Sequence, residues 1–68
     1  MDTMLRALRI EHLRARVELC RIACAALERE YYAGGRSVRE MADIARRWGD
    51  ALKLGNAARM ELDRLGVE

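Results

Sequence analysis

The stretch that decides the fold is LRALRIEHLRARVELCRIACAALEREY, residues 5–31. Apolar and small side chains recur along it at alternating intervals of three and four residues. One such series, here called the inner seam, comprises Ile10, Leu13, Val17, Cys20, Cys24, Leu27 and Tyr31. This alternation is the heptad pattern of a helix that packs lengthwise against another helix. It therefore predicts one long helix with a buried stripe.

A second series of the same kind lies on the same stretch. This series, here called the outer seam, comprises Leu5, Leu8, His12, Ala15, Leu19, Ile22 and Ala26. On a helix the two seams lie about 140° apart. A single neighbouring helix covers only about 100° of a helix surface. Because the outer seam would remain exposed in a simple hairpin, it predicts an oligomer interface.

Glycines and a capping pattern mark the first two helix ends. The first helix is predicted over residues 3–33, because Gly34 and Gly35 can take the left-handed conformation that ends a helix. Ser37 and Glu40 have the spacing of a capping box, which predicts that a second helix begins there. The short turn between them predicts an antiparallel hairpin.

The same kind of punctuation recurs near the carboxyl end. Gly55 is expected to end the second helix, which then covers residues 37–54. Asn56 is expected to cap a short third helix over residues 57–65, and Gly66 to end it. The predicted fold is therefore all-α: a single domain over residues 1–68, with a long, coiled-coil-like antiparallel hairpin, a short C-terminal helix and an oligomeric state.

The hairpin core is predicted from the apolar stripe of the second helix and the inner seam that it would cover. Its members are Leu13, Val17, Cys20, Cys24, Leu27, Tyr31, Met41, Ile44, Trp48 and Leu52. In a monomeric alternative, the third helix would fold back over the outer seam. Nine residues span only about 14 Å, however, which is too short for that stripe. We therefore expect self-association, or docking on another helical partner.

Composition limits the classes of function. The chain has 68 residues, a net charge of +2 and no proline or phenylalanine, which suits one small helical domain. No apolar run approaches the length of about 20 residues that a membrane helix needs, and no signal peptide is visible, so we expect a cytosolic protein without membrane partners. Cys20 and Cys24 are expected to be reduced thiols. With only His12 in addition, they predict no metal site.

Catalysis needs a nucleophile beside a base, paired carboxylates in a cleft, or a metal cluster. The sequence offers one serine, which the capping box explains, and one histidine at a seam position. It predicts no enzyme and no cofactor. DNA contact is the other chemistry considered, because Arg6, Arg9 and Arg16 have no acidic partner at helical spacing. Repetition in an oligomer would turn them into a positive belt for phosphates. The alternative, pairing of these arginines between subunits, is equally open.

Residues 31–67 resemble the corresponding part of phage terminase small subunits, chiefly in the stretch IARRWGDALKLGNAARM, residues 44–60. The resemblance implies a homo-oligomer, with a ring as one arrangement, in the cytoplasm of a bacterial host. It also implies weak, non-specific DNA binding and recruitment of a large ATPase–nuclease subunit. The residues expected to bind that subunit are Leu54, Arg59, Leu62 and Leu65. Typical members of the family carry an amino-terminal helix-turn-helix domain, for which this sequence has no room ahead of the first helix. We therefore expect either a reduced form of the kind found in gene transfer agents or an excised oligomerisation domain.

A different class of function remains open beside it. The second hypothesis is a small helical adaptor or regulator whose exposed apolar seam docks on a partner protein's helix.

Overall fold

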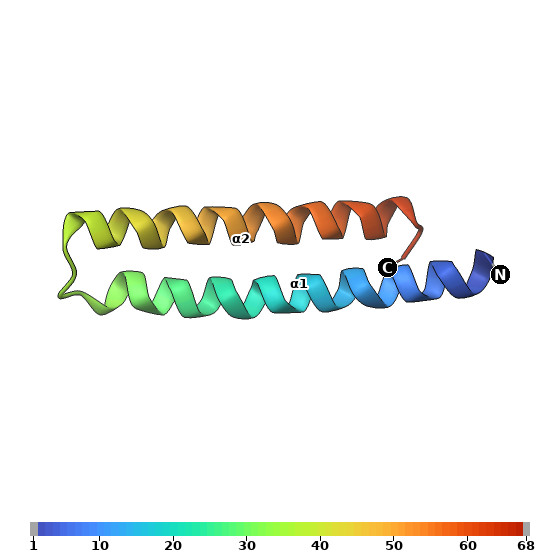
Figure 1. Ribbon diagram of the computed structural model, residues 1–68, viewed down its shortest axis with the longest axis horizontal. Helices are drawn as coiled ribbons and strands as arrows, with labels where there is room; N and C mark the ends of the chain where they lie inside the picture. Colours follow the sequence, from blue (N-terminus) through green and yellow to red (C-terminus); the bar gives the residue numbers. More distant parts are fainter. Residues whose placement is uncertain (1, 68) are drawn as a thin grey trace.

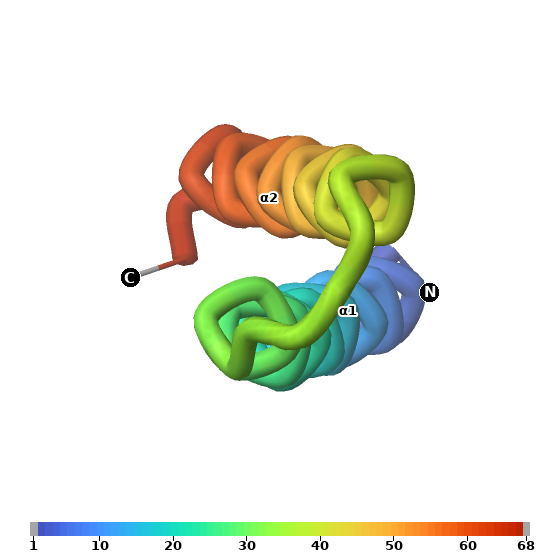
Figure 2. The backbone as a smooth tube through the Cα atoms, turned by 90° about the vertical axis from the view of Figure 1, so that its left-hand side faces the viewer, coloured from blue at the N-terminus to red at the C-terminus, as the bar shows by residue number. Residues whose placement is uncertain are grey.

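The computed structural model describes residues 2–67, and this part of the chain forms two helices, α1 (Asp2–Ala33) and α2 (Val38–Arg64). The helices run antiparallel and side by side in a rod of 53 × 17 × 14 Å (Figure 1). Seen along the rod, one helix lies directly over the other, and the connecting segment crosses between them (Figure 2). The predicted all-helical hairpin is therefore confirmed.

The turn between the helices has the predicted chemistry. Gly34 and Gly35 have φ values of 78° and 72°, in the left-handed region, directly after the last residue of α1. Ser37 Oγ accepts a hydrogen bond from the backbone N–H of Glu40 at 3.2 Å, and Glu40 Oε1 accepts one from the backbone N–H of Ser37 at 3.1 Å. The capping box is confirmed, and it sets the first residue of α2.

The predicted break at Gly55 is wrong, because α2 continues through it to Arg64. A Cβ atom added at Gly55 would lie 3.2 Å from the Cβ atom of Cys20. Glycine stands here because the two helices approach each other closely, not because the helix ends. Asn56 is consequently an interior residue of α2 rather than the cap of a third helix.

Small residues line the face of α2 that packs against α1 on both sides of Gly55. Its residues that face α1 keep the alternating spacing throughout and are Met41, Ile44, Trp48, Ala51, Gly55, Ala58, Leu62 and Leu65. The best buried hydrophobic side chains are Leu13 at 1%, Ile44 at 2% and Ala58 at 3% exposure. The other inner-seam residues of α1 are half-buried. The core is thus a single line of contacts between two helices.

The assignment of Leu52 to this core is wrong. Its side chain is 49% exposed, and Ala51 takes the seam position between Trp48 and Gly55. Leu52 lies one residue, or about 100°, further round the helix and flanks the core. Near the turn, the ring of Trp48 lies 6.1 Å from the ring of Tyr31, measured between centroids. This aromatic pair closes the turn end of the hairpin.

The other end of α2 finishes as predicted at Gly66, whose φ is 77°. The backbone N–H of Val67 donates to the carbonyl of Leu62, and that of Gly66 donates to the carbonyl of Asp63, both at 3.0 Å. These two bonds form a Schellman motif. Within residues 2–67, neither helix combines the length and the apolar character needed to cross a bilayer.

Candidate self-association surface

The outer seam lies along α1 where α2 gives no cover. Leu5 is 65% exposed, Leu8 57%, Leu19 66% and Ile22 51%. His12 and Ala15, between these two pairs, are also exposed, whereas Ala26 is half-buried. From Leu5 to Ile22 the stripe runs about 26 Å along the helix. A stripe of mostly apolar side chains along a thin rod is a surface suited to packing against another helix.

Charged residues border this stripe on both edges. Arg9 and Arg16 follow one edge, and Glu11 and Glu18 follow the other. Arg9 pairs with Glu61 of α2 at 2.5 Å, and Glu18 pairs with Arg21 at 2.6 Å. The hydrogen bond and charge of Arg21 hold the pKa of Glu18 below its ordinary value. Two of the four border charges are therefore already paired within the chain.

The other two border charges are Glu11 and Arg16. Among residues 2–67 neither forms an ion pair. A guanidinium nitrogen of Arg16 lies 3.2 Å from Nε2 of His12, one turn away on the outer seam. The sequence predicts Arg16 as a DNA contact and gives Glu11 no role. Both residues lie at heptad positions that border the outer seam.

Two of the three arginines predicted to contact DNA are engaged within the hairpin. Arg6 donates a hydrogen bond to the backbone carbonyl of Leu65, and Arg9 pairs with Glu61. Both arginines find their partners at the far end of α2, not within α1. Antiparallel packing brings the last turns of α2 beside the first turns of α1, so partners far along the chain become neighbours (Figure 1).

Of the four residues predicted to bind a large subunit, two are half-buried within the hairpin and two are exposed. Leu62 and Leu65 are half-buried on the inner face of α2 and contribute to the hairpin core instead of a free surface. The cause is the continuous helix, which extends the core seam into a segment that was expected to stand apart. Leu54 is 55% exposed, and Arg59 is exposed beside the gap between the helices.

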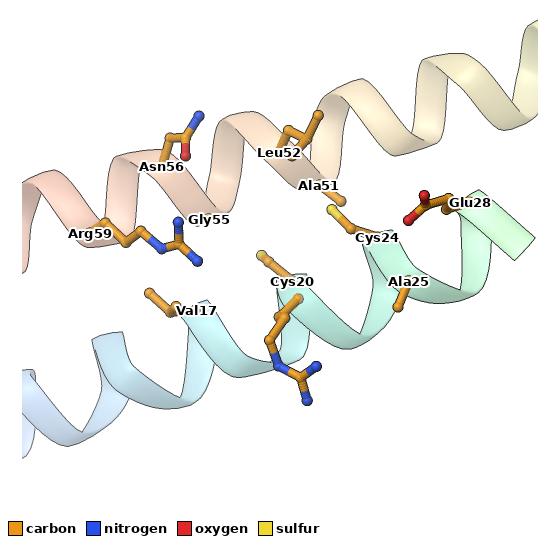
Figure 3. A pocket seen from close by; sticks show the side chains of 11 residues that line it. Val17, Cys20, Cys24, Ala25, Glu28, Ala51, Leu52, Gly55, Asn56 and Arg59 are labelled. Atoms are coloured by element: carbon orange, nitrogen blue, oxygen red, sulfur yellow. The ribbon is translucent and has the colours of Figure 1, made fainter.

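A groove that the sequence analysis missed opens on one side of the hairpin (Figure 3). Its volume is about 290 Å³, and its floor is formed by Cys20, Cys24, Ala51 and Gly55. The two sulfur atoms point from α1 toward α2, and both thiols are free (Figure 3). The signal for the groove is the set of small residues on the facing seams, which leaves the edge of the contact unfilled.

Within residues 2–67, no three or more His, Cys, Asp or Glu side chains gather into a cluster that would hold a metal ion.

Comparison with family models, with curated proteins and with solved structures finds no match for this chain. The chemistry of the outer seam and its charged borders is therefore the basis for a functional proposal.

Proposed function

We propose that this chain is a self-associating helical module in which the outer seam of α1 packs against another copy. The observation that carries the proposal is the exposure of four large aliphatic side chains on one stripe, Leu5, Leu8, Leu19 and Ile22, each more than half exposed. Complete burial of such a side chain contributes about 1.5–3 kcal/mol. Partial burial of several of them in a dimer is a substantial driving force for association.

The thin core supports the same proposal. Among residues 2–67 the buried hydrophobic side chains are Leu13, Ile44 and Ala58. A domain this small buries a modest fraction of its surface, and many domains of this size depend on disulfides, a metal or a second chain. Cys20 and Cys24 are free thiols, and the described residues contain no metal cluster. A second chain is then the remaining means of burying more apolar surface.

We further propose, from the resemblance of residues 44–60 to phage terminase small subunits, that the assembly serves DNA packaging. It would bind DNA weakly, without sequence preference, and recruit a large ATPase–nuclease subunit. Arg6 and Arg9 are engaged within the hairpin, and Arg16 borders the seam that a second copy would cover. The phosphate contacts would therefore come mainly from Arg14, which is exposed and forms no ion pair among residues 2–67. Repetition in an oligomer would multiply this modest charge.

The alternative, an adaptor that docks on a partner protein's helix, uses the same exposed seam. It predicts a single chain in solution, whereas the self-associating module predicts a multiple of 7.8 kDa. Light scattering at increasing protein concentration separates the two. A multimer supports the module, and a monomer at all concentrations supports the adaptor.

The interface is tested by Leu19→Asp, which places a charge in the middle of the outer seam. The variant should lose the multimer and keep its α-helical circular dichroism at high concentration. Met60→Asp is the matched control, because Met60 is 62% exposed on α2, away from the outer seam. It should remain multimeric. A Leu19→Asp variant with the wild-type mass would refute the interface.

The DNA proposal is tested by gel retention of unrelated duplexes at low and moderate salt. Retention should be similar for all sequences and should fall steeply as salt rises, because binding to phosphates releases counterions. Arg14→Gln should weaken retention and leave the mass of the assembly unchanged, because Arg14 lies outside the outer seam. A multimer that retains no DNA at low salt, or retains it undiminished at high salt, would contradict the packaging role.

A further inference from the structure

We infer that the occupant of the outer seam is a second copy in parallel orientation and in register, so that each seam residue meets its own counterpart. The inference rests on the self-association proposed above and adds an orientation to it. It starts from the two edges of the seam, which carry opposite charges: Arg9 and Arg16 along one edge, Glu11 and Glu18 along the other. In paired helices, the orientation decides which edges meet.

Antiparallel pairing brings like edges together. Arg16 would then lie beside Arg9 of the second copy, and Glu11 beside Glu18 of the second copy. Like charges at such positions repel each other and weaken pairing. Parallel pairing brings unlike edges together instead. Each residue of the glutamate edge then lies near the residue of the other copy that is five positions further along the chain. Glu11 of each chain then meets Arg16 of the other.

The ion pairs that the four border charges form within one chain also favour parallel pairing. Arg9 and Glu18 are already held, by Glu61 at 2.5 Å and by Arg21 at 2.6 Å. Glu11 and Arg16 have no ion pair among residues 2–67. The two free charges are the two that the parallel register pairs, twice by symmetry. This complementarity selects a copy of the chain over an unrelated helix.

The seam itself fits the same register. Leu5, Leu8, Leu19 and Ile22 would each pack on their own counterparts, which makes four aliphatic layers in two pairs. His12 and Ala15 lie between these layers and are exposed in the single chain. A polar residue at one seam position fixes register, because a shift by one repeat would place it against leucine. His12 therefore meets His12 of the second copy, with the small Ala15 layer beside it.

Disulfide trapping tests the orientation directly. The background is the double variant Cys20→Ala, Cys24→Ala. Its number of chains per assembly and its circular dichroism spectrum must equal those of the wild type. Into it go Leu5→Cys or Ile22→Cys, at positions about 26 Å apart along the helix. In parallel register each variant cross-links with itself, and a mixture of the two gives no mixed disulfide. A mixed disulfide without self-links would establish antiparallel pairing and overturn the inference.

The mass in solution of the background protein, without any cross-link, separates the proposal of self-association from that of the parallel register. If the background protein is multimeric and no variant cross-links with itself, the parallel register is wrong while self-association stands. If the background protein is monomeric although the wild type is multimeric, the same cysteines are introduced into the wild-type chain, and peptide mapping identifies which cysteines each cross-link joins. If the wild type is monomeric at all concentrations, self-association and the register fail together.

Charge reversal gives an independent test whose sign differs between the orientations. In parallel pairing Glu11→Arg weakens association about tenfold, since it turns two attractions into repulsions. Arg16→Glu has the same effect, and an equimolar mixture of the two variants regains wild-type affinity as a heterodimer. In antiparallel pairing Glu11→Arg would strengthen association, because the new arginine would face Glu18. Glu28→Arg, an equal charge change on the groove side of α1, is the control and leaves the affinity unchanged.

Discussion

The inner and outer seams of α1 have the same alternating spacing but different surroundings. The inner seam holds Leu13 at 1% exposure, whereas Leu19 on the outer seam is 66% exposed. Both seams satisfy the rule for a helix–helix contact, so periodicity alone does not distinguish them. The difference lies in what faces each seam. The inner seam packs against α2, where small residues allow close approach, whereas the large aliphatic side chains of the outer seam from Leu5 to Ile22 stay more than half exposed.

The largest expected effect comes from the same substitution made on each seam. Leu13→Ala should lower the free energy of unfolding by about 2–5 kcal/mol, because it opens a cavity in a core with few other buried side chains. Leu19→Ala should leave the hairpin folded and weaken association only. Chemical denaturation followed by circular dichroism, at a concentration that keeps both variants monomeric, measures the contrast. Equal losses for the two variants would remove the distinction between the seams.

The next effect concerns two glycines of α2. A Cβ atom at Gly55 meets the Cβ atom of Cys20 at 3.2 Å, whereas one at Gly49 meets nothing within 4 Å. Gly55→Leu should therefore force the helices apart and cost about 1–3 kcal/mol. Gly49→Ala should stabilise the protein by about 0.5–1 kcal/mol through helix propensity. Thermal melts of both variants decide the matter, and a stabilising Gly55→Leu would contradict the close approach.

These glycines also show what the sequence was able to predict. The turn at Gly34 and Gly35, the capping box at Ser37 and the inner seam of α1 follow local rules, and all agree with the structure. Gly55 followed by Asn56 looks like a helix stop by the same rules. Its real role depends on Cys20, which lies on the other helix, and local patterns do not include that contact. The regular spacing of Ala51, Gly55 and Ala58 was the available clue.

The candidate site divides in a similar way. The outer seam was predictable, because exposure follows from having one neighbouring helix and two seams. The partners of Arg6 and Arg9 were not, because Leu65 and Glu61 become neighbours only once the second helix runs unbroken beside the first. Leu62 and Leu65 were misplaced for the same reason. One mistaken helix break therefore accounts for most of the errors in the site.

A smaller effect is expected at the start of α2. Ser37→Ala removes the hydroxyl oxygen that accepts from the Glu40 N–H at 3.2 Å and should cost about 1 kcal/mol. Ser37→Asp retains an acceptor at the cap and should recover most of that loss. Both variants should keep the wild-type association, since the cap lies outside the outer seam. Loss of the multimer in Ser37→Ala would mean that the turn takes part in assembly.

The smallest effect is a dependence on pH. Hydrogen bonds from the backbone N–H and the hydroxyl of Ser37, aided by the charge of Arg36, hold the pKa of Glu40 below its ordinary value of 4.5. The carboxylate therefore stabilises the folded state above that pH, and the contribution disappears as pH falls through the folded-state pKa. The stability difference between wild type and Glu40→Gln should be constant near neutrality and shrink in acid. A difference that grows in acid would have the wrong sign.

The most direct test of the central claim is the melting temperature of the wild-type chain as a function of its concentration. If a second copy covers the outer seam, association stabilises the folded state by mass action, and Tm rises with concentration. Leu19→Asp should remove that dependence, whereas Met60→Asp should keep it. A cooperative melt whose Tm is the same over a wide range of concentrations, with a monomeric mass throughout, would contradict the account.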